Sequence, residues 1–432
     1  MKRLFTTAAA VAFLCVATFG QNREMSLKEI FTLADASDKN IAAMEFSRKA
    51  AAENESAAKA QRLPDVKIAA SGSLYGDGRV WDRDFSDGMN VGMPRWGNNL
   101  AVEASQLIYA GGAVNSGIKM AELSSEMSDL KLQSTRADVR FSLSGKFLQL
   151  HKLLSYVKIY EKNIELMDTL MLNVRSKVEQ GMVLQTDYDR YAIQREELVL
   201  QKREVEDAAT VINRNMVLVL GLDESVNIIP IGGEEIVSNT QEVDWYSDAE
   251  DHSYALSMAR LAEEMSGVKE KLEKSALLPK VAFVAQYHLD GPITIEVPVL
   301  DQNYRYAFLG LNFSFDIGAL YKNNRKVRAA KYESAAASEH TVSVQQGVET
   351  AIKDAYSSFN RSFDELKVRE NSLRLAENNY RLIVERYNQG LSLVTDVLDA
   401  SNVMLKSEMD LKNSKVGVVY NYYQLLYLSG KI

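Results

Sequence analysis

The sequence predicts a mainly α-helical protein with a membrane β-barrel portion, built from a duplicated helix–strand–strand–long helix–helix unit. Three observations support this fold class: long stretches without proline, an internal repeat, and four segments of alternating polarity. Only six of the 432 residues are proline, and none lies between Pro94 and Pro230 or after Pro298. Because proline breaks helix interiors, these two stretches favour very long helices.

The N-terminus predicts a signal peptide over residues 1–20. Lys2 and Arg3 precede an apolar run that ends near Gly20, a pattern typical of export signals. The only cysteine, Cys15, lies within this segment, so the mature chain would contain no disulfide and no reactive thiol. The formal net charge of −8 gives no indication of nucleic-acid binding. No later segment has about 18 consecutive apolar residues, so any membrane-spanning part is expected to consist of strands.

The mature chain contains one sequence pattern twice. Residues 180–187 and 389–396 share Gln-Gly-x-x-Leu-x-Thr-Asp at an offset of 209 residues. Upstream, the Leu-Pro pairs that begin at Leu63 and Leu278 match at an offset of 215 residues, so the first copy has six more residues between these landmarks. The duplication indicates two structural repeats.

We place the two structural repeats at residues 21–230 and 231–432, with the same order of elements in each. Each repeat begins with a helix, over about 26–62 and 245–277. The Leu-Pro pair ends this helix, because the residue before proline is pushed out of the helical region. Two strands, a long helix and a returning helix follow.

Each repeat is predicted to contain one exceptionally long helix, at about 113–178 and 319–388. The first, if continuous, would span about 99 Å. Gly181 and Gly390 end these helices, and an antiparallel helix follows each glycine. Apolar residues three and four positions apart form a coiled-coil seam along each long helix. The seams consist of Val139, Leu143, Phe147, Leu150, Leu154 and Val157, and of Phe359, Phe363, Leu366, Leu373, Ala376, Tyr380, Ile383 and Tyr387.

Four segments have the length and alternating polarity of transmembrane β-strands. They are Val66–Leu74, Asn99–Ala110, Lys280–Leu289 and Arg305–Asp316. Four strands leave open edges, which lipid does not tolerate, so a membrane-spanning chain must oligomerise. Two copies would give eight strands around a filled interior, whereas three copies give twelve strands around a channel. A trimer with a 12-stranded barrel is therefore the smallest arrangement with a useful pore.

The duplicated plan resembles the TolC-like outer-membrane factors, the outer membrane efflux protein family, over residues 24–432. The resemblance is carried by the Leu-Pro-x-Val strand starts, by Tyr109-Ala110-Gly111-Gly112, and by the turn from Gly390 through Thr395-Asp396-Val397-Leu398-Asp399-Ala400. It implies a trimeric duct, in which an outer-membrane barrel continues into a long α-helical coiled-coil tunnel across the periplasm. The implied function is passive export of small molecules in a tripartite efflux system.

The resemblance also implies the partners and the docking residues. The partners are two further copies of the chain, outer-membrane lipid, a periplasmic adaptor (membrane fusion) protein and an inner-membrane pump, for example of the resistance-nodulation-division type. Gly181 and Gly390 mark the two hairpins at the periplasmic tip, and Leu184 and Leu393 follow them in the sequence. These four residues are the expected docking site for the adaptor.

The resemblance places Tyr387 among the contacts that hold the tip shut. Its counterpart in the first repeat is Val178, so the two repeats differ here. Asp187 is a candidate hydrogen-bond acceptor for Tyr387, and Thr186 precedes it. Ser392 occupies the place of the family's usual basic residue after the second glycine, which puts an ion pair from that position in doubt. Ordinary packing of Tyr387 in the helix seam is the alternative.

Two acids follow the second glycine turn. Asp396 and Asp399 are three residues apart and therefore share one helix face. If that face lines the pore, three chains supply a narrow ring of six carboxylates, which would attract cations. The equivalent residues of the first repeat are Asp187 and Arg190, so only the second hairpin carries two acids. Solvated acids at a helix start are the alternative.

No enzymatic function is predicted. The four histidines have no metal-ligand spacing, and the sequence contains no phosphate loop, nucleophile elbow or triad pattern. We therefore expect no catalytic residue, no metal site and no cofactor. Two alternatives remain: the outer-membrane duct of a type I protein-secretion system, and a soluble periplasmic coiled-coil adaptor. The adaptor hypothesis explains the helices but not the strands.

Overall fold

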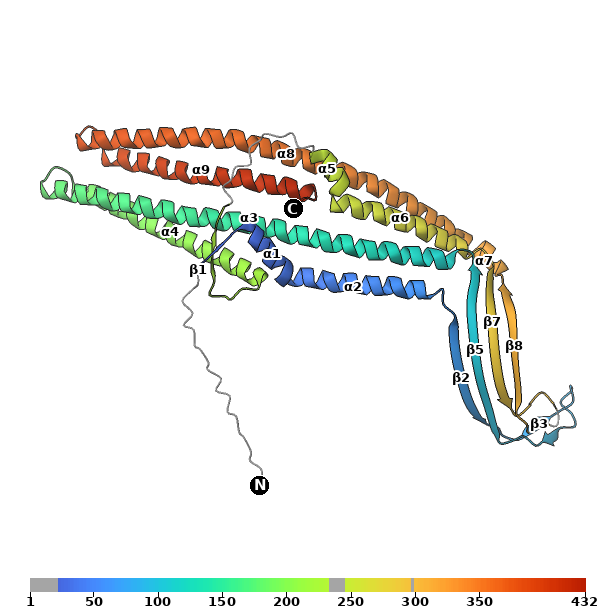
Figure 1. Cartoon of the computed structure of the whole chain (residues 1–432). Coiled ribbons are helices and arrows are strands. Elements are labelled where there is room, and N and C mark those ends of the chain that lie inside the picture. Colours follow the sequence, from blue (N-terminus) through green and yellow to red (C-terminus); the bar gives the residue numbers. More distant parts are fainter. Residues whose placement is uncertain (1–21, 233–244, 297–298) are drawn as a thin grey trace, which may run out of the picture. The chain divides into compact units, whose positions relative to one another are not determined.

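The computed structural model describes residues 22–232, 245–296 and 299–432 (Figure 1). The predicted signal peptide and Cys15 lie outside the described residues. The chain forms two compact units, and each unit contains parts of both structural repeats. One unit comprises residues up to Met44, Gln133–Ser253 and Gly347–Ile432, and the other comprises Glu45–Leu132 and Tyr254–Gln346.

The same order of elements occurs in both repeats, as predicted. The first repeat contains α1 (Leu27–Ser37), α2 (Lys39–Ala60), β2 (Asp65–Leu74), β5 (Trp96–Ala110), α3 (Ala113–Glu179) and α4 (Gln185–Leu220). The second contains α5 (Trp245–His252), α6 (Tyr254–Ser275), β7 (Lys280–Gly291), β8 (Tyr304–Ser314), α7 (Ile317–Lys322), α8 (Asn324–Asn388) and α9 (Val394–Leu428). A short ribbon of β3 (Gly78–Val80) and β4 (Met89–Val91), which was not predicted, lies within the segment that connects β2 to β5.

The helix predicted over 26–62 is in fact two helices, so this prediction was wrong in one respect. Asp38 separates α1 from α2 and has an extended backbone, with φ −64° and ψ 129°. Its carboxylate accepts hydrogen bonds from the backbone N–H groups of Asn40 at 2.8 Å and Ile41 at 3.0 Å. Asp38 therefore caps α2, because it satisfies N–H groups that have no partner within the helix.

The second repeat contains two similar breaks. Ser253, which is buried, separates α5 from α6 within the predicted helix 245–277. Asn323 separates α7 from α8, so the helix predicted over 319–388 is also interrupted. Asp316, predicted as the last residue of a strand, instead caps α7: its carboxylate accepts a hydrogen bond from the N–H of Ala319 at 3.3 Å.

The helix α3 is continuous over 67 residues, as predicted from its lack of proline. Gly145 lies in its interior, where a Cβ atom would meet the ring of Tyr420 at 3.5 Å, an ordinary van der Waals distance. Glycine is thus tolerated here and not required. The predicted seam of α3 is buried: Leu143, Phe147 and Leu150 are all at most 2% exposed.

A short parallel ribbon joins the start of the described chain to the segment after α4. The strand β1 (Asn22–Met25) pairs with β6 (Asn227–Pro230), which was not predicted. The buried side chain of Asn213 on α4 makes two hydrogen bonds with the backbone at the start of β6. Its amide group donates to the carbonyl of Val226 at 2.8 Å and accepts from the N–H of Ile228 at 2.8 Å.

The second unit contains an antiparallel sheet in the order β2-β5-β7-β8. Directly paired residues share a face of the sheet, so the register separates the side chains into two sets. One face is apolar and carries Val66, Ile68, Leu100, Val102, Phe283, Tyr287, Leu309, Leu311 and Phe313. The other face is more polar and carries Lys67, Ser71, Asn99, Glu103, Ser105, Gln286, His288 and Asn312, together with Leu107, Val284, Tyr306 and Phe308.

The apolar face of the sheet is exposed in the single chain. Ile68 and Leu309 are each 74% exposed and Leu311 is 70% exposed. Within the described residues β2 and β8 each have a neighbour on one side only, so both edges of the sheet are open. The register, which separates most apolar side chains from most polar ones, confirms the predicted alternation of polarity along the strands.

Candidate functional site

Two helical hairpins with the same turn geometry form the ends of the long helices (Figure 1). Gly181 lies between α3 and α4 with φ +70°, and Gly390 lies between α8 and α9 with φ +74°. The N–H of Met182 donates to the carbonyl of Lys177 at 2.8 Å, and the N–H of Leu391 donates to that of Arg386 at 2.8 Å. Both turns are therefore Schellman-type helix ends, which require the left-handed conformation that glycine adopts most easily.

Tyr387 belongs to the hydrophobic core between the two hairpins. It is 6% exposed and belongs to the same cluster as Tyr191, which is fully buried on α4. The other buried members of this hairpin core are Tyr160, Met167, Leu170, Val174, Leu198, Val394, Val397 and Leu405. Tyr387 thus packs in the helix seam, and this position is compatible with a role in holding the hairpins together.

Tyr191 was not identified from the sequence, although the repeat contains a signal for it. At the offset of 209 residues, Tyr191 corresponds to Ala400, and Tyr387 corresponds to Val178. At each of these two matched positions, one repeat has a tyrosine and the other repeat has a smaller residue. Comparing side-chain volumes at matched positions of the two repeats could have identified both tyrosines.

The two tyrosine hydroxyls have no hydrogen-bond partner among the described residues. The hydrogen bond expected between Tyr387 and Asp187 is therefore not formed within the single chain. Burial, and to a lesser extent the charge of half-buried Asp187, raises the pKa of Tyr387. The ammonium group of Lys177 lies 4.4 Å from the centre of the Tyr387 ring, a cation–π distance. Thr186 is exposed, and its hydroxyl makes no hydrogen bond with a described residue.

The acids Asp396 and Asp399 both lie on an exposed face of α9. The carboxylate of Asp396 accepts a hydrogen bond from the N–H of Leu393 at 2.9 Å and so caps the start of its own helix. Within the described part of the chain Asp399 makes no hydrogen bond or ion pair. The structure thus supplies a local role for Asp396 and leaves Asp399 free to interact with solvent or with other chains.

Large apolar side chains are exposed at both hairpin turns. Leu184 and Leu393 are each 70% exposed, Met182 is 71% exposed and Leu391 is 63% exposed. These four residues occupy equivalent positions in the two repeats, at the offset of 209 residues. Because exposed apolar clusters mark interaction surfaces, the hairpin turns are a candidate docking surface.

Replacing Tyr191 provides a test of the hairpin core. Tyr191→Phe is expected to leave the free energy of unfolding within about 1 kcal/mol of the wild type, because its buried hydroxyl has no partner to lose. Tyr191→Ala is expected to cost about 3–5 kcal/mol, because it removes a fully buried ring. Thermal melts monitored by the helical circular-dichroism signal measure both. An equal loss in the two variants would show that the hydroxyl is hydrogen-bonded in the assembled protein.

Within the described residues, no helix has both the length and the apolar character needed to cross a membrane. No group of three or more histidine, cysteine, aspartate or glutamate side chains in the same ranges is arranged to hold a metal ion.

Comparison with known sequences relates the second repeat to a defined family. Residues 245–430 match the model of the outer membrane efflux protein family. The chain is 22% identical to the outer membrane protein TolC of Salmonella enteritidis over 190 residues, 43% of this chain and 39% of that protein. It is 19% identical to the outer membrane efflux protein BepC of Brucella suis over 374 residues, 86% of this chain and 80% of that protein. The match thus spans well under half of the TolC relative.

Comparison with solved structures extends the similarity to almost the whole chain. The outer membrane protein VceC of Vibrio cholerae superimposes with a TM-score of 0.79 at 14% identity, over 94% of this chain and 96% of that one. The chain therefore shares the fold of this outer membrane protein. Residues 245–430 match the outer membrane efflux protein family, and the predicted resemblance to the TolC-like outer-membrane factors is confirmed.

Proposed function

We propose that three copies of this chain form the outer-membrane channel of a tripartite efflux system, which passively exports small molecules. The observation that carries this proposal is the four-stranded sheet, with one exposed apolar face, one polar face and two open edges. A soluble protein would have to cover the apolar face with other elements. In a bilayer, lipid covers that face and the polar face lines a water-filled lumen.

The directions of the edge strands support closure between copies. In the order β2-β5-β7-β8 every neighbouring pair is antiparallel, so β2 and β8 run in opposite directions. The β8 edge of one copy can therefore pair with the β2 edge of the next as a further antiparallel pair. Three copies joined in this way give a closed barrel of twelve strands with no free edge.

The hairpins supply the periplasmic part of the proposed channel. The continuous helices α3 and α8 have 67 and 65 residues, long enough for a tunnel of about 100 Å. We assign docking of the periplasmic adaptor to the exposed leucines Leu184 and Leu393 beside Gly181 and Gly390. An inner-membrane pump would deliver its substrates through this adaptor. The fold match to outer-membrane channels favours this duct over the soluble adaptor hypothesis.

The hairpin tips also carry the proposed constriction. The exposed pair Asp396 and Asp399 would form a ring of carboxylates that attracts cations. Tyr387 would hold the closed tip by its packing in the hairpin core, and exposed Thr186 and half-buried Asp187 would make contacts with neighbouring copies.

The assembly and conductance of the purified protein test this proposal. We expect extraction from outer membranes only with detergent, a detergent complex that contains three chains, and ion conductance across a planar lipid bilayer. Native mass spectrometry measures the number of chains, and bilayer recordings measure the conductance. A stable water-soluble monomer that does not conduct would contradict the proposed function.

A further inference from the structure

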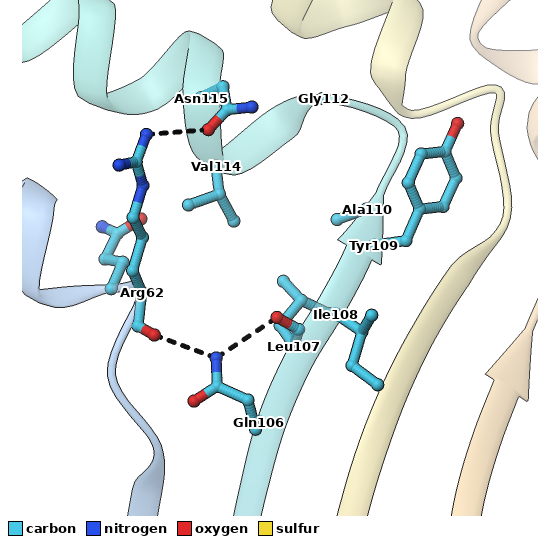
Figure 2. Close-up of a pocket in the computed structure, with 10 residues that line it drawn as sticks. Arg62, Gln106, Leu107, Ile108, Tyr109, Ala110, Gly112, Val114 and Asn115 are labelled. Carbon is cyan, nitrogen blue, oxygen red and sulfur yellow. Dashed lines mark hydrogen bonds between the residues drawn. The ribbon is translucent and has the colours of Figure 1, made fainter.

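A pocket of about 310 Å³ lies where the sheet meets the helices of the second unit (Figure 2). Its lining includes Arg62, Gln106, Tyr109, Val114 and Asn115. We infer that this pocket binds the phosphate head group of a membrane phospholipid. The inference rests on the proposed membrane location of the sheet, and it assigns a ligand to a part of the chain far in sequence from the hairpin turns.

The pocket exists because two strands end at different levels along β5. The strand β2 pairs with β5 only as far as Asp65, which lies opposite Ser105. The strand β7 continues along the other side of β5 to Lys280, opposite Ala110. The last residues of β5 therefore have no strand on the β2 side. Gln106 partly bridges this gap: its amide donates to the carbonyl of Arg62 at 3.0 Å and to that of Leu107 at 3.3 Å (Figure 2).

An irregularity in β5 moves a tyrosine to the apolar face of the sheet beside this pocket. Leu107 pairs with Ala282 and Tyr109 pairs with Val281, so Ile108 is an extra residue between the two pairs. Without this bulge, Tyr109 would follow Ser105 and Leu107 on the polar face. Because Val281 belongs to the apolar face, Tyr109 lies at the end of that face. Tyrosine is enriched at this level of membrane proteins, where the apolar core meets the head groups.

Arg62 provides a positive charge at the same level. Its guanidinium donates to the side-chain oxygen of Asn115 at 3.0 Å and makes no ion pair with a carboxylate among the described residues. A guanidinium has five N–H donors, so several remain for a further acceptor. The positive guanidinium of arginine is complementary to the negative phosphate diester, because its parallel N–H groups can donate to two phosphate oxygens at once. Exposed Ile108, at the same end of β5, would lie along the acyl chains.

The second repeat has no cation at the equivalent position. At the offset of 215 residues that relates the Leu-Pro pairs, Arg62 corresponds to Leu277. The duplicated fold therefore does not itself require arginine before the first strand of a repeat. Each chain has one such cation, and a trimer would hold three head groups around its circumference.

Lipid binding to the intact protein in detergent tests this inference. Native mass spectrometry would count phosphatidylglycerol bound per trimer for the wild type and for Arg62→Ala and Arg62→Gln. The glutamine variant keeps an uncharged polar side chain with two N–H donors, so it separates loss of charge from loss of the side chain. Arg325→Ala is the matched control, because Arg325 is an exposed arginine at the start of α8 in the same unit and does not line the pocket.

We expect both Arg62 variants to bind phosphatidylglycerol about tenfold more weakly than the wild type, since a charge-assisted hydrogen bond is lost. Arg325→Ala should bind like the wild type, and diacylglycerol, which lacks the phosphate, should bind none of them tightly. Unchanged phosphatidylglycerol binding in both Arg62 variants would overturn the inference. Displacement of the lipid by millimolar inorganic phosphate would also overturn it, because the site would then bind free phosphate. The same spectra also count the chains in each complex. If the Arg62 variants form trimers and bind the lipid like the wild type, the lipid site is refuted but the proposed trimeric channel is not.

Discussion

Replacing Ile68 by arginine is expected to abolish insertion of the protein into the outer membrane. Ile68 is 74% exposed on the apolar face of the sheet, near the middle of β2. An arginine on the lipid side of a barrel costs about 2–4 kcal/mol at the bilayer midplane, and each of the three chains would bear this cost. Membrane fractionation measures the amount of inserted protein, and heat-modifiable migration in detergent gels measures the assembled trimer.

The adjacent residue provides the matched control for this substitution. Ala69 is also exposed on β2, but its register partner Ala101 belongs to the polar face. In the proposed barrel Ala69→Arg places its charge in the water-filled lumen, so insertion should remain close to that of the wild type. Equal loss of insertion in the two variants would show that the faces of the sheet are not separated into lipid and lumen sides.

Removing the charges of Asp396 and Asp399 together is expected to reduce the cation selectivity of the channel and to weaken block by trivalent cations. Asparagine is the informative replacement, because at position 396 it retains an acceptor for the N–H of Leu393. Two unit charges about 4 Å apart in water attract by about 1 kcal/mol, and a trivalent ion is attracted to a carboxylate about three times as strongly. Loss of the ring charges should therefore weaken trivalent block by at least about tenfold. Planar-bilayer recordings of reversal potential and block measure both quantities.

A distant acid provides the control for the loss of charge. Asp223 follows the far end of α4 and accepts hydrogen bonds from the N–H and hydroxyl of Ser225, so Asp223→Asn also removes a charge while it keeps an acceptor. This variant should retain the selectivity and block of the wild type. If the double variant at 396 and 399 inserts normally and also behaves like the wild type, these acids do not line the pore.

The periodic features of the sequence predicted most of the fold. The absence of proline after Pro94 predicted α3 over 113–178, and the structure has it over Ala113–Glu179. The period of two predicted the four strands within a few residues, because apolar alternation directly specifies which face of a strand is buried or meets lipid. The glycine turns were correct because the left-handed backbone at Gly181 and Gly390 requires a specific residue type.

Local side-chain chemistry and long-range pairing account for what the sequence did not reveal. The break at Asp38 depends on one carboxylate that caps the next helix, and the surrounding apolar period continues across it. The pairing of β1 with β6 joins segments about 200 residues apart, which no local pattern specifies. The bulge at Ile108 is visible only when β5 is aligned with β7. Spacing alone does not single out Tyr191, because a buried tyrosine on a helix seam has the same spacing as any other core residue.

The central claim, that open edges of separate copies join into one barrel, is tested most directly by cysteine cross-linking. Cys15 is the only cysteine, so a Cys15→Ser background accepts new cysteines on the two edge strands. Ala70→Cys on β2 and Ala307→Cys on β8 lie on the same face of the sheet, and both positions are exposed. The account predicts that a flexible bismaleimide links the double variant into covalent trimers, whereas either single variant remains monomeric on a denaturing gel. Covalent dimers formed by a single variant, with no trimer from the double variant, would contradict the account.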